Sequence, residues 1–219
     1  QDLSLNVAGM RRVATIDPRF QSYNIEMVEV TGGRFWRPYA ATDTPGATPD
    51  LFANRAPIDL ADTRLRKLAS ALSPAYLRVS GTWANSTFFA DADHPPTTPP
   101  PGFKGILTRR QWRGVIAFSR AVDAPIVTSF AISTGTRNKT GRWAPGQAQR
   151  LLAFTRSIGG RIAAAEFMNE PDLPAIGGAP DGYDATAYAR DFAIFRAFME
   201  QESPRVTILG PGTSGTGAD

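Results

Sequence analysis

An asparagine and a glutamate stand side by side at the end of an apolar run of the sequence. Residues 163–168 are mostly small or apolar, and Asn169, Glu170 and Pro171 follow them. Parallel α/β sheets and barrels keep their chemistry at the carboxyl ends of their strands, so this placement favours a catalytic role. A carboxylate that ends a buried strand is costly unless it has partners or a function. The pattern indicates an acid catalyst, and glycoside hydrolysis is the chemistry that fits it best.

Glu170 is the candidate general acid of such a reaction. A glycosidase acid must carry a proton near neutral pH, which requires burial or a neighbouring negative charge. Asn169 can donate a hydrogen bond to the sugar hydroxyl next to the reacting carbon, and such bonds strengthen in the oxocarbenium-like transition state. The alternative is structural, with Glu170 capping the next helix or pairing with an arginine.

Neighbouring carboxylates do not complete the pair that this chemistry needs. Glu166 precedes Glu170 by four residues, which corresponds to about 13 Å along a strand. A retaining pair is separated by about 5–5.5 Å and an inverting pair by about 6.5–9.5 Å. We therefore expect Glu166 to lie deeper in the sheet, paired with a polar neighbour. Glu26, on an earlier strand, either binds the sugar or forms an interior ion pair, and both interpretations stay open.

Further candidate binding residues follow the apolar run 76–80. Thr82 and Asn85 offer hydrogen bonds to a ligand. Trp83 can stack on a sugar ring, or it can be an aromatic side chain that packs within its loop. The predicted substrate-binding residues are Asn169, Glu26, Thr82 and Trp83.

Composition excludes several other kinds of site. The sequence has no cysteine, which excludes disulfides and thiolate metal sites and leaves the compartment undecided by this criterion. His94 is the single histidine and lies in a turn-rich loop, so we expect a solvated side chain. A histidine zinc site and a Ser-His-Asp triad are therefore poorly supported, and we predict no metal and no organic cofactor.

The charge is basic and carried by arginine. Of the 24 basic residues 21 are arginine, and the net charge is +4. Arginine suits the planar recognition of carboxylates, sulfates and phosphates, as in an acidic polysaccharide or a nucleic acid, although a genome rich in arginine codons gives the same composition. The arginines are scattered, which counts against nucleic acid. No apolar run approaches the ~20 residues of a membrane span, so we expect no membrane partner. As a separate prediction, we expect a secreted or periplasmic protein.

Strands and helices are predicted to alternate after residue 22, which gives βαβ units and a parallel sheet. No phosphate-binding glycine fingerprint follows the first strand, so a dinucleotide-binding fold is not expected. The predicted strands are 23–30, 76–80, 125–132, 163–168 and 206–209, and the predicted helices are 62–72, 108–118, 145–158 and 184–202.

Loop lengths favour a barrel. Loops after strands, such as 34–60, are long and loops after helices are short, as in a (β/α)8 TIM barrel whose strand-to-helix loops build the active site. A full barrel has eight units in about 250 residues, so we expect the N-terminal part of one. Open strand edges are an aggregation hazard, so we expect a C-terminal segment or a second chain to complete it. The runs 3–7 and 13–16 read as short strands before the barrel.

Several segments together resemble glycoside hydrolase family 79, the heparanase and β-glucuronidase family of clan A. Residues 72–82, Leu-Ser-Pro-Ala-Tyr-Leu-Arg-Val-Ser-Gly-Thr, resemble the segment that ends the second barrel strand of that family. Residues 166–171 match its acid/base motif, and 206–212 resemble its fifth strand with a Gly-Pro corner. The likeness covers most of 15–212, and the Ser-Pro-Ala-Tyr-Leu-Arg run is its specific part.

The resemblance implies a role for each candidate residue. Glu170 is implied to be the general acid/base, and Asn169 the contact of the sugar 2-hydroxyl. Glu26 stands where the family has an acidic sugar-binding residue, and Thr82 stands at a subsite contact. The family's nucleophile is a glutamate at the end of the seventh strand, and no residue of this sequence occupies that position.

The resemblance also implies a domain organisation and a substrate. Residues 1–14 are implied to contribute strands to a β-sandwich, and 15–219 to form about five βα units of the catalytic barrel. The implied activity is retaining hydrolysis of β-linked glucuronic acid, exo or endo, in glucuronides or glycosaminoglycan-like polysaccharides. Residues 173–180 lack the basic residue that heparanase has there, so a heparan-specific subsite is not matched. The alternatives are a clan A glycosidase acting on neutral β-glycosides and a non-catalytic carbohydrate-binding barrel.

Overall fold

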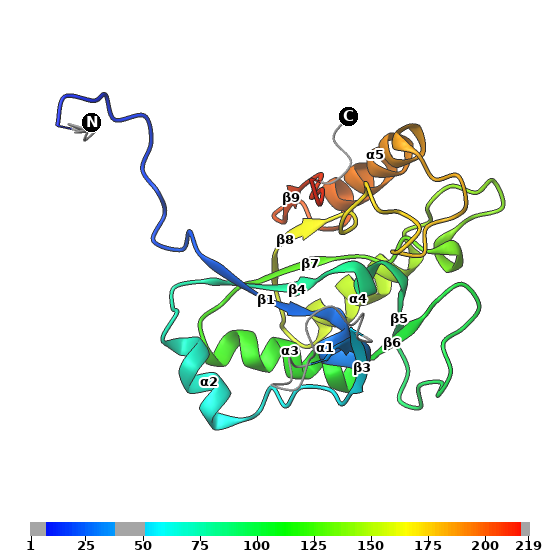
Figure 1. Ribbon diagram of the computed structural model, residues 1–219, viewed down its shortest axis with the longest axis horizontal. Coiled ribbons are helices and arrows are strands. Elements are labelled where there is room, and N and C mark those ends of the chain that lie inside the picture. Colours follow the sequence, from blue (N-terminus) through cyan, green and yellow to red (C-terminus); the bar gives the residue numbers. More distant parts are fainter. Residues whose placement is uncertain (1–7, 38–50, 216–219) are drawn as a thin grey trace, which may run out of the picture.

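A parallel five-stranded sheet organises the chain (Figure 1). The computed structural model describes residues 8–37 and 51–215. In the sheet, the strands follow one another in chain order, without the reversal of a doubly wound sheet. The predicted mixed α/β fold with a parallel sheet is confirmed, and the sheet stays open within the described ranges. Its strands, in order, are β1 (Ser22–Glu26), β4 (Tyr76–Ser80), β7 (Ile126–Ser129), β8 (Ile162–Glu166) and β9 (Thr207–Leu209).

Helices connect the parallel strands, and several of them begin directly after a side chain that caps the first turn. Thr108 accepts a hydrogen bond from the Gln111 amide, and Asp184 accepts one from the Ala187 amide, so each satisfies a free N–H of a first turn. In Figure 1, α2 and α3 lie below β1 and β4, and α5 lies beside β8 and β9. The helices are α1 (Met27–Thr31), α2 (Thr63–Ser70), α3 (Arg109–Ala121), α4 (Gly146–Ser157) and α5 (Ala185–Glu202).

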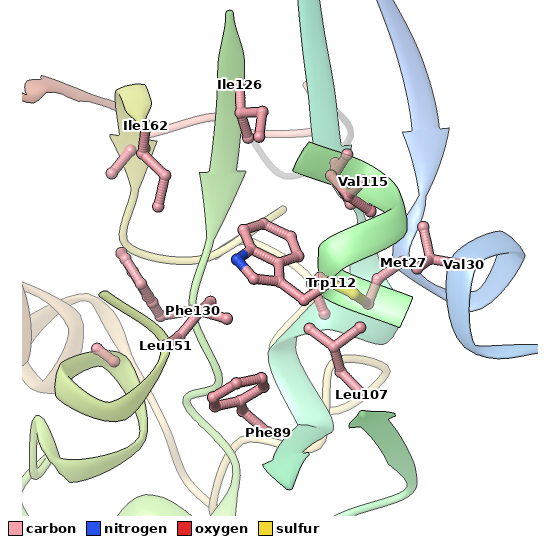
Figure 2. Packing of buried hydrophobic residues seen from close by; sticks show 14 of the residues in the cluster. Met27, Val30, Phe89, Leu107, Trp112, Val115, Ile126, Phe130, Leu151 and Ile162 are labelled. Atoms are coloured by element: carbon pink, nitrogen blue, oxygen red, sulfur yellow. The ribbon is translucent and has the colours of Figure 1, made fainter. Parts of the chain in front are cut away.

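The core lies between the sheet and these helices. Leu77 and Val79 of β4 are fully buried, and Trp112 of α3 is fully buried as well. The Trp112 indole N–H donates to the Thr155 hydroxyl at 2.7 Å, which ties α3 to α4 and leaves no unpaired polar atom on the ring. Figure 2 shows Trp112 within the cluster that also contains Met27, Leu107, Phe130 and Leu151.

The first predicted strand is shorter than expected. Residues 23–30 were predicted as one strand, but β1 ends at Glu26 and α1 begins at the next residue. The Glu29 carboxylate accepts a hydrogen bond from the Glu26 amide at 3.0 Å and so starts a helical turn. The strand therefore ends with Glu26 at the carboxyl edge of the sheet.

The predicted loop 34–60 contains a β-hairpin. Strands β2 (Gly33–Trp36) and β3 (Phe52–Arg55) pair antiparallel, so a loop was the wrong prediction for these residues. Residues 38–50 lie outside the described ranges. A second unexpected pair of strands follows β4. Strand β5 (Thr87–Ala90) runs parallel to β6 (Gly105–Thr108), and the proline-rich loop 91–104 connects the two. Two short 3-10 turns complete the elements, η1 (Thr82–Ser86) and η2 (Thr134–Thr136).

The opening segment differs from the prediction where it is described. Residues 13–16 form no strand, and Val13 and Ile16 are exposed. The prediction of a strand from the sequence pattern was wrong here, because no strand pairs with these residues in the described ranges. The run 3–7 lies outside those ranges, and the assignment of residues 1–14 to a β-sandwich stays a prediction. The sequence spacing also predicts that Leu65, Leu68 and Leu72 share one stripe of the helix 62–72, but Leu68 is 61% exposed and does not face the core.

A buried ion pair fixes the loop after β7 to α5. Arg137 pairs with Asp191, whose side chain is fully buried. Burial opposes the Asp191 charge, but hydrogen bonds from Arg190, the Trp143 amide and Arg137 outweigh it and hold the pKa of Asp191 below its usual value. None of the helices in the described ranges is both long and apolar enough to cross a bilayer.

Candidate active site

The predicted acid lies at the carboxyl edge of the sheet, just after β8. Glu170 Oε2 accepts hydrogen bonds from the Thr82 hydroxyl at 2.8 Å and from the Asn169 side-chain amide at 3.0 Å. Glu170 Oε1 accepts none from the described part of the chain. Because two donors hold Oε2, Oε1 is the oxygen that keeps its capacity to hydrogen-bond a ligand.

An unusual backbone conformation presents this carboxylate. Glu170 has φ of 48°. This left-handed conformation costs a residue other than glycine roughly 1–3 kcal/mol of conformational free energy. The Glu170 amide donates to the Gly212 carbonyl at 3.0 Å, and the Glu170 carbonyl accepts from the Leu173 amide at 2.9 Å, so both sides of the residue are held. Strain that the surroundings maintain is concentrated at functional sites, which favours a functional Glu170 over a merely structural one.

Every polar atom of Asn169 makes a hydrogen bond. Its side-chain carbonyl accepts from Arg78 at 2.8 Å, which fixes the amide so that its NH2 group faces Thr82 at 3.1 Å and Glu170. The Asn85 side chain hydrogen-bonds both backbone groups of Asn169. Its oxygen accepts from the Asn169 amide at 3.0 Å, and its NH2 group donates to the Asn169 carbonyl at 2.8 Å. A sugar hydroxyl that binds Asn169 must therefore replace one of these two NH2 contacts.

Glu166 pairs with a polar neighbour, as predicted. Arg78 Nε and Nη2 donate to the two Glu166 carboxylate oxygens at 2.5 and 3.0 Å. Burial opposes the Arg78 charge, but the hydrogen bonds and negative charge of Glu166 outweigh it and raise the pKa of Arg78. Arg78 thus joins the Glu166 carboxylate to the Asn169 amide, a link that the sequence did not indicate.

Glu26 belongs to the same network. Asn24 accepts from Arg78 Nη1 at 2.8 Å and donates to Glu26 Oε1 at 3.0 Å, so Glu26 connects to Arg78 through one side chain. Burial raises the pKa of Glu26, against the Asn24 hydrogen bond and the Arg78 charge that lower it, and the Glu29 and Glu170 charges raise it further. Its Oε2 is buried with no partner in the described ranges.

Gly81 makes room for that carboxylate. A Cβ at Gly81 would lie 1.6 Å from Glu26 Oε2, and Gly81 has φ of +93°, which other residues rarely adopt. Close approach of Glu26 to the backbone after β4 therefore requires a glycine at this position.

Substitution of Gly81 by alanine is expected to destabilise the protein by about 2 kcal/mol or more, because the methyl group displaces Glu26 and strains the backbone. Urea unfolding monitored by tryptophan fluorescence measures the change. Gly114→Ala in α3 is the matched control, since its Cβ meets nothing within 4 Å in a helix, and it should stabilise by about 0.5–1 kcal/mol. Equal stability of the Gly81→Ala variant and the parent would contradict this account of Glu26.

The predicted binding residues Thr82 and Trp83 occupy different surroundings. Thr82 contacts the acid directly, as described above. The Trp83 ring is half-buried and meets Phe35 edge-on, with ring centroids 5.0 Å apart. The packed-aromatic interpretation of Trp83 thus describes part of its role, and its contact with a sugar stays a prediction.

A pocket lies beside part of this network. Its volume is about 440 Å³, and its lining includes Arg78, Glu166, Asn169, Glu170 and the corner 209–213 after β9. Larger hollows of about 920 and 1070 Å³ lie elsewhere, beside α3 and at the start of β7 and β8. We take the smaller pocket as the candidate active site because the carboxylates, the amide and the strained residue all meet there.

The described residues contain no cluster of three or more metal-ligating side chains. His94 is exposed in its loop, as predicted. The two nearby aspartates, Asp91 and Asp93, are paired with Arg109 at 2.7 and 2.9 Å.

Comparisons with known proteins give structural likeness only. No protein-family model matches the chain, and no curated protein matches it. A ligand-free α-N-acetylgalactosaminidase, NagBb from Bifidobacterium bifidum, is similar at 13% identity with a TM-score of 0.40, covering 86% of this chain and 35% of that one. The same enzyme in complex with Gal-NHAc-DNJ gives 12% identity and a TM-score of 0.35 over 86% of this chain and 33% of that one. The chain spans about a third of the length of these structures. Likeness at this level does not carry an activity from one protein to another.

Proposed function

We propose that this chain carries the acid/base half of a retaining glycoside hydrolase that cleaves β-linked glucuronic acid. The observation that supports it most is the environment of Glu170. A carboxylate follows a buried parallel strand, in a strained conformation, with one oxygen held by Thr82 and Asn169, and it lines a pocket. Such a group is poised to exchange a proton with a ligand.

The proposed reaction has two steps. In the first, Glu170 donates its proton to the glycosidic oxygen while a second carboxylate attacks the anomeric carbon, so the bond to the leaving oxygen breaks and a glycosyl-enzyme forms. In the second, Glu170 takes a proton from water, whose oxygen attacks the same carbon and releases the nucleophile. The configuration of that carbon is retained because it is inverted twice.

The nucleophile is proposed to be a glutamate outside this sequence, as the family resemblance implies. Within the pocket, both oxygens of Glu166 accept from Arg78, so its negative charge is already paired. The chain-order parallel sheet supports the further proposal that these strands are the first five of a (β/α)8 barrel, which another segment or a second chain completes.

The choice of glucuronic acid rests on the resemblance of residues 72–82 to family 79. The test uses the full-length protein and a panel of 4-nitrophenyl β-glycosides, with the product anomer followed by proton NMR. We expect the β-glucuronide to be cleaved fastest, with β-glucuronic acid as the first product. Preference for the xyloside or the glucoside would favour the neutral-glycoside alternative. Sugar binding without hydrolysis of any member would favour a binding barrel.

A further inference from the structure

The β2–β3 hairpin carries an exposed aromatic stack. Trp36 and Phe52 lie directly opposite each other in the antiparallel pair. Their rings stack, with centroids 4.6 Å apart and planes 24° from parallel. Trp36 is still 49% exposed. Because Phe52 covers one face of the indole, a flat apolar ligand would stack on the other face.

A second layer of aromatic rings supports this stack from the protein side. Phe35 points to the opposite face of the hairpin and is buried. Trp83 contacts Phe35 edge-on at 5.0 Å and Phe52 at 6.2 Å between centroids. The four rings form one aromatic cluster, so the position of the exposed Trp36 face is fixed by packing rather than by a single loop.

The same cluster is joined to the candidate active site at two points. Trp83 directly follows Thr82, whose hydroxyl contacts Glu170. The hairpin directly follows α1, which begins next to Glu26. Helix α1 also packs against η1, the turn that contains Thr82 and Trp83. Short, packed segments therefore connect the stack to Thr82 and Glu26.

Guanidinium groups border the stack. Arg34 lies over the Phe52 ring, with its central carbon 5.7 Å from the centroid. Arg55 donates to the Trp36 carbonyl at 3.2 Å, and both arginines are exposed. Arginine can hydrogen-bond a carboxylate or sulfate while it stays stacked on an aromatic ring. Arg55 thus places a positive charge at the edge of the apolar platform.

We propose that Trp36, Phe52 and Arg55 form a platform that binds a second sugar unit of an acidic oligosaccharide, next to the unit whose bond is cleaved. The apolar face of a pyranose ring lies on Trp36, and Arg55 pairs with an acidic group of the oligosaccharide. The proposal deepens the glucuronidase function and depends on it for the position of the first sugar. The platform makes the protein selective for oligosaccharides over simple glucuronides.

The test compares Trp36→Ala with the parent in the full-length protein, using a hyaluronan tetrasaccharide and 4-nitrophenyl β-glucuronide. The ratio of kcat/KM for the tetrasaccharide to that for the aryl glucuronide is expected to fall about tenfold, since loss of one stacking contact is of that order. Trp36→Phe keeps a stacking ring and should restore most of the ratio. Phe20→Ala is the matched control, because Phe20 is an aromatic residue 72% exposed before β1, remote from the hairpin in the chain.

Calorimetric titration of the tetrasaccharide separates failure of the platform from failure of the glucuronidase proposal. Done in a Glu170→Gln background, it needs no turnover, and Trp36→Ala should raise Kd about tenfold. Cleavage of the aryl glucuronide with an unchanged ratio and an unchanged Kd would overturn the platform and leave the activity standing. Weaker binding in a protein that cleaves no glucuronide would support the platform and overturn the activity. Absence of tetrasaccharide binding by the parent would overturn the platform.

Discussion

Glutamine in place of Glu170 is expected to lower turnover of poor-leaving-group β-glucuronides by about 10²–10⁴-fold in the full-length protein. Glutamine keeps the shape and can accept the hydrogen bonds from Thr82 and Asn169, but it has no acidic proton to transfer to the leaving oxygen. The fold should therefore be preserved, and steady-state kinetics on alkyl and aryl glucuronides with unfolding curves beside them measure both effects.

Leaving-group dependence distinguishes the acid from a residue that only binds. A 2,4-dinitrophenyl glucuronide needs little help from an acid, so formation of its glycosyl-enzyme should slow far less than that of an alkyl glucuronide. Glu200→Gln, an exposed carboxylate on α5, is the matched control and should leave all rates unchanged. Full activity of Glu170→Gln on an alkyl glucuronide would refute the assignment.

Loss of Arg78 is expected to have the largest effect on stability. Arg78→Met leaves the Glu166 carboxylate, whose side chain is 9% exposed, without its partner. Removing one member of a buried pair costs roughly 3–5 kcal/mol. We expect the lower end, about 3 kcal/mol, because the Arg78 side chain is 26% exposed and water screens part of the charge. Urea unfolding at pH 7 measures the loss.

A double-mutant cycle identifies the cause of that loss. Glu166→Gln in the Arg78→Met background removes the uncompensated charge and should recover at least half of the lost stability. Activity should not recover with it, because Asn169 has lost the donor that orients its amide toward Glu170. A cost below about 1 kcal/mol for Arg78→Met would show that the pair behaves as a surface ion pair and not as the centre of the network.

The order of helices and strands could be predicted from the sequence, because the spacing of apolar residues and the helix-capping residues are signals within each segment itself. The run 163–168 and its Asn-Glu-Pro corner placed Glu170 at a strand end, and Thr108 and Asp184 marked helix starts that the structure confirms. Strand β1 was predicted too long because Met27 and Val28 suit a strand or a helix equally, and only the bond between Glu29 and the Glu26 amide decides between them.

The contacts that build the site were beyond prediction from one sequence because their partners are distant in the chain. Glu166 was expected to have a polar neighbour, but Arg78 lies 88 residues away and nothing local selects it. Asn85 was interpreted as a ligand contact, and the structure shows it holding the Asn169 backbone. The β2–β3 hairpin was missed because strands of four residues in a proline-rich stretch give too short a pattern.

Azide rescue of Glu170→Ala tests the central claim most directly. The full-length variant is assayed on 2,4-dinitrophenyl β-glucuronide with added sodium azide, and the product is identified by NMR. If Glu170 is the acid/base, azide enters the vacated space and attacks the glycosyl-enzyme from the side that water uses. Turnover should then rise and β-glucuronosyl azide should form. An α-azide would show that Glu170 is the nucleophile, and a rate that azide does not change would show that Glu170 is not the acid/base.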